Sequence, residues 1–263
     1  MGELRPSGAE LAAVVSEREL LRLVGLPRGR ELGGELRERA QAARAWFATN
    51  GRPFAATRRF DVERVSPSDV RLTEGSELRS EALADGLRAT GGHAAVVLAV
   101  SAGREVAAEA RRLWASDTPD EAYFLDRFAA AVTEALVLWA SGSECRKASG
   151  AGETLLPPLS PGCGRFEIGD QHRLMRLLAA EDTGSERMRL GPIELLSTGA
   201  LDPQHSLLAV LGVTRQALAT ATPEDLCRGC ELDPCRFRRA AFLDADRDRV
   251  PSSLVEAPRD SSA

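Results

Sequence analysis

Hydrophobic residues recur along the chain with two spacings, and each spacing predicts a different kind of element. Apolar positions three and four residues apart predict helices over residues 8–26, 32–51, 76–90, 104–116 and 118–142. Shorter apolar runs predict two or three strands within 52–75, a buried strand over 93–103, and strands over 193–197 and 205–213. The last two strands are expected to be antiparallel neighbours. This irregular mixture predicts an α+β fold rather than a doubly wound parallel sheet.

Turn and cap residues place the boundaries of these elements. Gly25 is expected to close the first helix, and Ser76 to begin the helix over 76–90. Residues 149–169 are rich in proline and glycine and predict a long loop. It leads into a helix over 170–178, which Asp170 is expected to cap. We expect a single domain over 1–244, with a thiol-rich extension at 222–244, and a disordered polar tail over 245–263.

Composition restricts the class of protein. With 263 residues, 43% hydrophobic and 28% charged, the chain has the composition of an ordinary globular protein. Its net charge of -5 argues against a nucleic-acid partner. The N-terminal stretch is not a signal peptide, and the longest apolar run is too short to cross a bilayer. The expected location is cytoplasmic, where thiols stay reduced.

The familiar catalytic motifs are absent from the sequence. It has no G-x-x-x-x-G-K-[ST] phosphate loop, no G-x-G-x-x-G after a strand and no H-E-x-x-H. Asp170-Gln171-His172 begins a corrinoid-binding D-x-H-x-x-G pattern, but Met175 stands in place of the glycine. His172 is therefore expected on a helix surface. His93, beside the apolar strand, is expected to be a satisfied core or strand-edge histidine rather than a ligand.

The proline-rich loop has a distinctive geometry. Pro157, Pro158 and Pro161 favour extended backbone, and Pro161-Gly162 suits the centre of a type II turn. Gly164 removes another side chain. Such a loop presents bare backbone groups, which is compatible with either a stiff connector or a binding loop.

The order of motifs along residues 17–213 resembles the reactivation domain of cobalamin-dependent methionine synthase and its stand-alone relatives. Family members carry an R-x-[SA]-P-G-Y-G-like loop, then a helix, then strands with an L-T-x-S-x-M-M-x-P-x-K-S-like signature. "LSPGCG" matches the loop, "DQHRLMRLL" the helix and "LLSTGALDPQHSLLAVLGV" the strands, with Pro203 and Ser206 in register. Ser101-Ala102-Gly103 is similar to a T-x-G turn, and a D-x7-E helix follows with Asp126 and Glu134.

This resemblance implies an α+β fold with a twisted, mostly antiparallel sheet inside a curved shell of helices. It also implies binding of S-adenosylmethionine during reductive remethylation of cobalamin, with a corrinoid-binding methyltransferase in trans and an external electron donor. The ligand-contacting residues it implies are Ser160, Pro161, Gly162, Cys163, Gly164 and Arg165 in the loop, with Asp126 and Glu134 on a helix lining the same cleft.

Several family positions are altered. Pro158 occupies the arginine position before the turn, Cys163 the tyrosine position and His205 the lysine position, while Ala200 and Leu201 replace twin methionines. An arginine contact to a ligand carboxylate contributes roughly 1.5–3 kcal/mol, so its loss weakens binding unless another arginine, such as Arg165, replaces it.

Three cysteines gather near the C-terminus in "CRGCELDPCRFRR". Thr222 and Asp233 are expected to cap two short helices that place the C-x2-C-x4-C thiols of Cys227, Cys230 and Cys235 together. Three thiolates are one short of a closed zinc or iron–sulfur site, and Cys163 is the candidate fourth ligand, ahead of Cys145. Reduced thiols packed under a helix hairpin are the alternative.

Two functions follow from these observations. The first is an accessory protein for reductive reactivation of a cobalamin-dependent methyltransferase, with S-adenosylmethionine as its own ligand and cobalamin carried by the partner. The alternative is a metal-binding redox or adaptor protein, with zinc or an iron–sulfur cluster, that keeps the fold without the methyl donor.

Overall fold

An antiparallel sheet forms the centre of the molecule in the computed structural model, which describes residues 2–26, 31–163, 165–179, 188–219, 222–228, 235 and 237–240. Its strands are β1 (Gly2–Leu4), β2 (Phe54–Val65), β3 (Asp69–Leu72), β4 (Glu77–Arg79), β5 (Ala94–Ser101), β6 (Thr154–Leu155) and β10 (Ser206–Thr214). They lie in the order β4-β3-β2-β5-β10-β6, and β1 pairs with the first half of β2, at residues 55–57. A smaller antiparallel sheet contains β7 (Met188–Leu190), β8 (Ile193–Leu195) and β9 (Leu201–Asp202).

Strand β5 is the middle of the main sheet, as its apolar sequence predicts. All eight of its residues are buried, because both faces of the sheet are covered at this strand. It pairs with β2 from Phe54↔Ser101 to Asp61↔Ala94 and with β10 from Ser206↔Ser101 to Val213↔Ala94. A strand buried on both faces gains from apolar residues at every position, which explains the uninterrupted run in the sequence.

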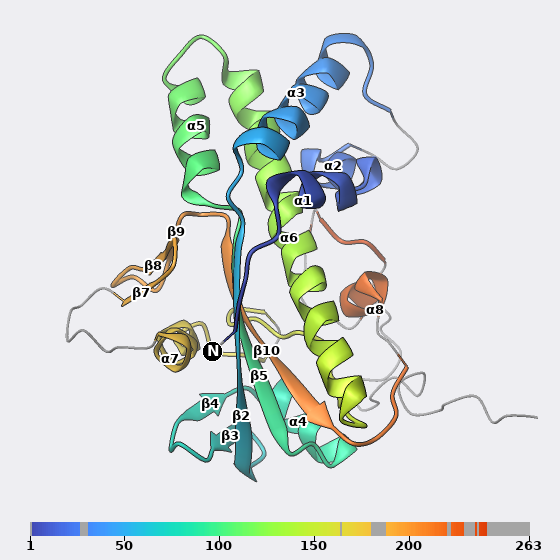
Figure 1. Cartoon of the computed structure of the whole chain (residues 1–263), viewed down its shortest axis with the longest axis vertical. Helices are drawn as coiled ribbons and strands as arrows, with labels where there is room; N and C mark the ends of the chain where they lie inside the picture. Colours follow the sequence, from blue (N-terminus) through green and yellow to red (C-terminus); the bar gives the residue numbers. More distant parts are fainter. Residues whose placement is uncertain are drawn as a thin grey trace, which may run out of the picture.

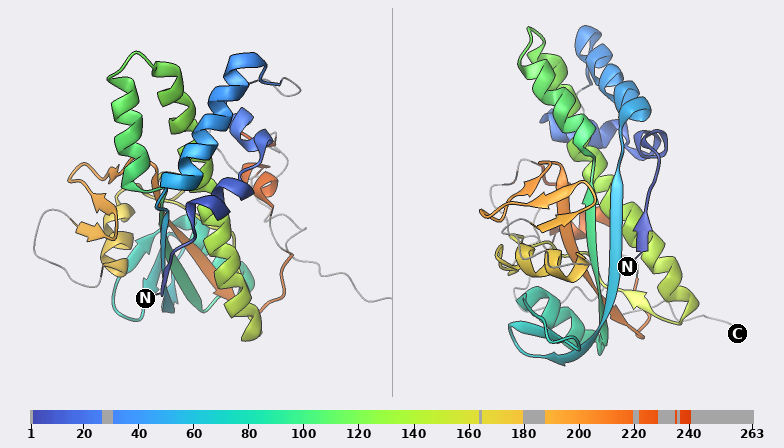
Figure 2. Two further views of the ribbon diagram at one scale, coloured as in Figure 1. Left: turned by 45° about the horizontal axis from the view of Figure 1, so that its top comes forward. Right: turned by 60° about the vertical axis from the view of Figure 1, so that its left-hand side comes forward.

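Helices cover the sheet on both sides (Figures 1 and 2). One hydrophobic core contains α1 (Gly8–Val14), α2 (Glu17–Val24), α3 (Gly34–Asn50), α5 (Arg104–Trp114) and α6 (Pro119–Gly150). The other contains α4 (Glu81–Thr90), α7 (Asp170–Leu178) and the small sheet. A short helix, α8 (Pro223–Arg228), follows near the C-terminus. Among the helices of the described residues, none is long and apolar enough to span a membrane.

The predicted helix over 8–26 is two helices. Val15 is extended and ends α1, and Ser16 starts α2 by accepting the Glu19 N–H at 3.2 Å. A serine side chain competes with the backbone for hydrogen bonds, which favours a helix start over a helix interior. Gly25 closes α2 in a left-handed conformation, as predicted.

Two other predicted boundaries are also wrong. The segment after Ser76 first forms β4, because residues 77–79 pair with β3, and Ser80 then caps α4. Helix α6 continues eight residues past the predicted end at 142, to Gly150, because Gly142 is accommodated within the helix.

The two closing strands do not pair with each other. Residues 193–195 form β8, which lies between β7 and β9 in the small sheet. Strand β10 instead fills the gap between β5 and β6 in the main sheet. The chain turns back at Leu201 and pairs with β8 before it enters β10. The two-residue β9 is therefore the antiparallel neighbour of β8, the position that the sequence predicted for β10.

A buried carboxylate fixes the end of α6 to the sheet. Glu153 is 8% exposed and accepts hydrogen bonds from the Arg59 guanidinium at 2.6 and 2.9 Å. The Nε2 atom of His93 lies 2.9 Å from the same carboxylate, so His93 has a structural partner, as expected for a satisfied core or strand-edge histidine. The hydrogen bonds from Arg59 outweigh the opposing effect of burial and, with His93, lower the pKa of Glu153 to about 2.

Replacing Glu153 with glutamine is expected to reduce the free energy of unfolding at pH 7 by about 2 kcal/mol, within the range for a hydrogen bond to a charged group. The pKa of Glu153 is lower in the folded state than its ordinary 4.5. Its stabilising effect is therefore complete above about pH 4.5 and is lost as the pH falls toward 2. Urea denaturation of both proteins across this range measures the difference. A difference that stays constant from pH 7 to pH 2.5 would contradict this assignment.

Candidate functional site

The proline-rich loop begins along the open edge of β10. After β6, the Leu156 N–H donates to Gly212 O at 2.8 Å, and Leu159 exchanges two backbone hydrogen bonds with Val210 at 2.8 and 2.9 Å. The loop therefore starts as an irregular continuation of the sheet, and its first residues are fixed by backbone contacts.

The turn at Pro161-Gly162 has the predicted geometry. The Cys163 N–H donates to Ser160 O at 3.0 Å, and Gly162 has φ +87°. A side chain at Gly162 would be strained in this conformation, and its Cβ would lie 2.9 Å from Ile168 Cδ1. Cys163 and Ile168 are both exposed. The turn thus presents its backbone next to an exposed apolar side chain.

The second half of the loop crosses to β4 and α4. Phe166 forms an antiparallel bridge with Ser80, and the Glu81 N–H donates to Arg165 O at 3.1 Å. The Arg165 guanidinium pairs with Glu81 at 2.8 Å and Asp85 at 2.9 Å. Arg165 is therefore held by two acids of α4, which argues against its replacing the missing family arginine. A cavity of about 590 Å³ lies here, lined by Ser68, Asp69, Arg79, Glu81, Arg165, Phe166 and Glu167.

Asp170 does not cap the helix that it begins. It is the first residue of α7, and the N-cap position, Gly169, has no side-chain cap. The buried Asp170 carboxylate accepts the Arg79 N–H of β4 at 2.6 Å and pairs with Arg173 one turn along the helix. Its role is to join α7 and the end of the loop to the edge of the sheet.

The two predicted acids of α6 have partners of their own. His205 Nε2 lies 2.7 Å from Asp126 Oδ1, and Arg127 also contacts Asp126. Burial alone would raise the pKa of Asp126. The opposing effect of His205 and Arg127 is larger in total, so the pKa of Asp126 lies below its ordinary value. Glu134 pairs with Arg22 of α2 and with Arg239.

The structure does not bring these acids and the loop to one cleft. Leu159 and Phe166 pack in the core with α4 and α7, whereas α6 packs in the core on the other face of the sheet. In the described part of the chain, the partners of Asp126 and Glu134 come from α2, α6, the start of β10 and the C-terminal region. The predicted shared cleft is therefore wrong, because the sheet separates its two walls. Gly164 lies outside the described residues.

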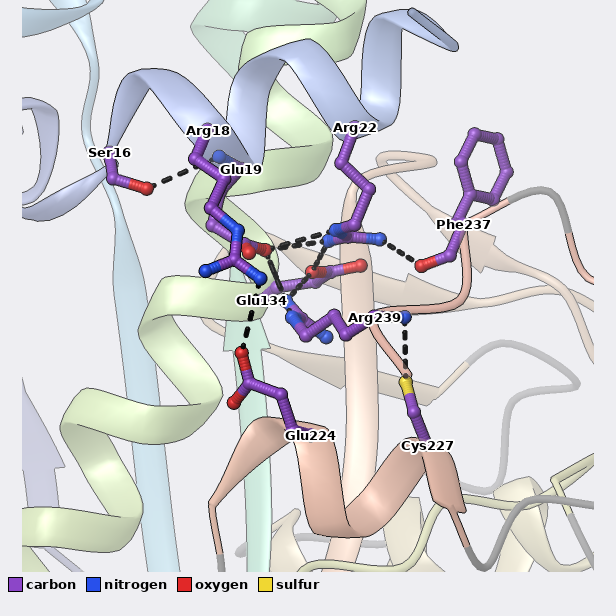
Figure 3. Close-up of polar contacts among 9 residues, drawn as sticks. All are labelled: Ser16, Arg18, Glu19, Arg22, Glu134, Glu224, Cys227, Phe237 and Arg239. Atoms are coloured by element: carbon purple, nitrogen blue, oxygen red, sulfur yellow. Dashed lines mark hydrogen bonds and ion pairs between the residues drawn. The ribbon is translucent and has the colours of Figure 1, made fainter. Parts of the chain in front are cut away.

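The sequence did not reveal the ion-pair cluster around Glu134 (Figure 3). Glu19 and Arg22 of α2 and Arg239 join Glu134 in this cluster, and Arg239 lies 220 residues from Glu19. Burial raises the pKa of Glu19, but Arg239 and Arg22 more than offset this, so its pKa is below its ordinary value. The arginine-rich run 236–239 was the visible signal, without an indication of its partners.

The described thiols do not assemble the predicted metal centre. Cys227 lies in α8, where its sulfur accepts the Arg239 N–H at 3.3 Å, and Cys235 is half-buried. Among the residues that the structure describes, no three histidine, cysteine or acidic side chains are grouped to hold a metal ion, so Cys163 does not join Cys227 and Cys235. Cys230 lies outside the described residues.

The predicted helices around the thiols are confirmed in part. Thr222 caps α8 by accepting the Asp225 N–H at 3.2 Å, and Pro223 is its first residue. Cys235 and residues 237–240 are not helical, contrary to the second predicted helix. Asp233, its predicted cap, lies outside the described residues.

Comparison with known proteins supports the fold. No family model and no curated protein matches the sequence. Among solved structures, the chain is similar to the crystal structure of the MetH reactivation domain bound to AdoHcy, with a TM-score of 0.61 and 16% identity over 84% of this chain and 80% of that one. At this level of identity the likeness concerns the fold, and it confirms the predicted α+β architecture with a curled antiparallel sheet.

Proposed function

We propose that this chain supports the reductive reactivation of a cobalamin-dependent methyltransferase, acting on a corrinoid protein supplied in trans. The observation that carries the proposal is the shared fold with the MetH reactivation domain over 84% of the chain. The confirmed turn at Pro161-Gly162, in the same position of the motif order, adds local support. The shared fold supports a role of this kind, and both the role and the particular partner are part of the proposal.

The need for a partner follows from the chain's own residues. The incomplete corrinoid-binding pattern at Asp170-Gln171-His172 lies in α7, and Met175, in the position of its glycine, is buried. A helix with that side chain in the core offers no loop for a cobalt-ligating histidine. The corrinoid would therefore be carried by the partner protein. An external donor would supply one electron for each reactivation.

The turn is the part of this chain that suits S-adenosylmethionine. Gly162 and Cys163 are exposed at this turn, and Ile168 adds an exposed apolar contact. S-adenosylmethionine, when bound, supplies the methyl group for cobalt. Pro158 has no cationic group for its carboxylate, and Arg165 is already paired, so we propose that binding is weak.

Calorimetry with S-adenosylmethionine tests this proposal. We expect measurable binding by the unaltered chain and at least a tenfold loss, about 1.4 kcal/mol, in Gly162→Val, because a β-carbon there forces the turn to change. Gly75→Val is the matched control: Gly75 has φ +96° with open space around it, far from the loop in sequence. Both variants carry a similar backbone strain of about 1–2 kcal/mol.

The outcomes separate clearly. No binding by the unaltered chain, or equal binding by Gly162→Val, would remove the turn as the ligand site. A second assay follows the absorption of a purified corrinoid methyltransferase during reduction with S-adenosylmethionine present. Faster return of the methylated corrinoid with the chain added, and a slower return with Gly162→Val, is the expected result.

A further inference from the structure

The outer face of β3 and β4 carries charged side chains. In both strands, charged residues alternate with Val70, Leu72 and Leu78, which are buried in the core beneath. Asp69 of β3 and Arg79 of β4 lie directly opposite each other in the antiparallel register. Their side chains therefore belong to the same face, where cross-strand neighbours have Cβ atoms about 4.5–5.5 Å apart.

The loop extends this charged face beyond β4. The Glu167 N–H donates to Arg79 O at 3.3 Å, and Phe166 forms a bridge with Ser80. Phe166 is buried, whereas Arg165 and Glu167 on either side of it are exposed. The cavity of about 590 Å³ lies over this face, at the end of the sheet where β3, β4 and α4 meet (Figure 1).

The cavity adjoins the Pro161-Gly162 turn. The Gly162 N–H donates to Phe166 O at 3.0 Å, so the turn is bonded to a segment that lines the cavity. Ile168, the side chain nearest to a Cβ placed at Gly162, follows in the same segment. A ligand on the turn can therefore extend into the cavity without crossing the sheet.

Arg79 and Asp69 both keep capacity for further hydrogen bonds. The Arg79 guanidinium lies 3.6 Å from the Glu167 carboxylate, a long contact between side chains that are 52% and 60% exposed. The Asp69 carboxylate accepts from the Ser68 hydroxyl at 2.8 Å. In the part of the chain that the structure describes, Asp69 and Arg79 form no ion pair with each other. A guanidinium and a carboxylate thus lie side by side, each with free positions for a ligand.

The lining of the cavity has one net negative charge. Asp69, Glu81 and Glu167 contribute three carboxylates, and Arg79 and Arg165 contribute two guanidinium groups. Arg165 is already paired with Glu81 at 2.8 Å, which leaves Asp69, Arg79 and Glu167 to face the cavity. An α-amino-acid group has an ammonium and a carboxylate on one carbon, so it matches an acid beside an arginine.

We propose that this cavity binds an α-amino-acid group, with Arg79 holding its carboxylate and Asp69 its ammonium. Where that group is the amino-acid end of S-adenosylmethionine, the inference rests on the proposed function, and the adenosyl end then lies toward the Gly162 turn. The additional sulfonium gives this ligand one net positive charge, which complements the lining. Both protein groups are partly exposed, so water screens their contribution, in agreement with weak binding.

Calorimetry on the full chain with three related compounds tests these roles. S-adenosylmethionine has both charged groups, S-adenosylmethioninamine lacks the carboxylate, and methylthioadenosine lacks the whole amino-acid end. In Arg79→Ala we expect about tenfold weaker binding of S-adenosylmethionine and unchanged binding of the other two. In Asp69→Asn we expect weaker binding of both compounds that carry an ammonium group, and unchanged binding of methylthioadenosine.

Arg71→Ala is the matched control for Arg79→Ala. Arg71 lies on the same face of β3, pairs with Glu63 at 3.2 Å and does not line the cavity, and its loss removes the same charge. It should change none of the affinities. Long-range attraction predicts tighter binding of a cationic ligand in both arginine variants, because each makes the chain more negative. That result, or an equal loss of all three compounds in Arg79→Ala, would overturn the proposal.

Free methionine distinguishes the two sources of the amino-acid group. If methionine binds, S-adenosylmethionine does not, and Arg79→Ala abolishes the binding, the amino-acid site stands and the proposed use of S-adenosylmethionine fails. If Gly162→Val loses S-adenosylmethionine and Arg79→Ala keeps it, the proposed function stands and this inference fails. Absence of binding by all four compounds overturns both.

Discussion

Replacing Asp170 with alanine is expected to lower the free energy of unfolding by about 3–5 kcal/mol, the range for breaking a buried ion pair by removing one partner. Asp170 is fully buried, and its carboxylate accepts the Arg79 N–H and pairs with Arg173. Alanine leaves a donor of β4 and a guanidinium of α7 without their acceptor. Guanidinium chloride denaturation followed by circular dichroism measures the change.

Asparagine at position 170 separates the loss of the charge from the loss of the hydrogen-bond acceptor. Asp170→Asn keeps an oxygen for the Arg79 N–H but loses the negative charge facing Arg173, so we expect a smaller destabilisation than with alanine. Asp225→Ala serves as the comparison on the surface, because Asp225 lies at the exposed first turn of α8. A loss below about 1 kcal/mol for Asp170→Ala, similar to a surface change, would show that β4 and α7 are not joined through this carboxylate.

Replacing Gly103 with alanine is expected to destabilise the fold by about 3 kcal/mol, through backbone strain and overpacking together. Gly103 precedes α5 and has φ +106°, a conformation that an alanine rarely adopts. Its Cβ would also lie 2.7 Å from the carbonyl oxygen of Arg52. Backbone cannot rotate away as a flexible side chain can, so β5 or α5 has to move.

Gly142→Ala is a control with the opposite sign. Gly142 lies inside α6, and the nearest atom to its Cβ would be in the Arg146 side chain at 3.7 Å. Alanine there is expected to stabilise the helix by about 0.5–1 kcal/mol. Thermal unfolding of both variants compares them directly. Equal effects of the two glycine replacements would contradict the argument from conformation and space at Gly103.

Local sequence patterns were sufficient to predict those helices and strands whose secondary structure does not depend on pairing with distant segments. The buried strand β5 and the helices α3, α5 and α7 were predicted near their observed positions from the local spacing of their apolar residues and from flanking turn residues. The turn at Gly162 and the cap at Thr222 were also predicted correctly. In both, the chemistry lies within a few neighbouring residues.

The errors in the predicted fold occur where distant partners decide. Both Ser76 and Ser80 precede glutamate and both suit a helix start, and the pairing of residues 77–79 with β3 selects Ser80. The separation of Asp126 and Glu134 from the loop depends on which face of the sheet each segment covers. Packing across the sheet determines which face each segment covers. The spacing of motifs along the sequence gives no information about this.

The candidate site was the least accessible to sequence reasoning. Glu19 and Arg239 lie at opposite ends of the chain, and no periodicity links residues 220 positions apart. The cysteine spacing invited a metal interpretation, whereas the described contact of Cys227 is with the backbone of Arg239. Family resemblance identified Glu134 as an acid of interest, but its arginine partners became evident only in three dimensions.

The central place of β5 has a consequence for the order of folding. Its partner β2 precedes it closely, but Ser206 of β10 pairs with Ser101 across 105 residues of chain. Closing so long a loop is entropically expensive and slow compared with forming local contacts. During synthesis, one edge of this largely apolar strand has to wait for the last third of the protein. Until β10 arrives, the nascent chain exposes an aggregation-prone strand, which makes this interval the period when a chaperone has most to protect.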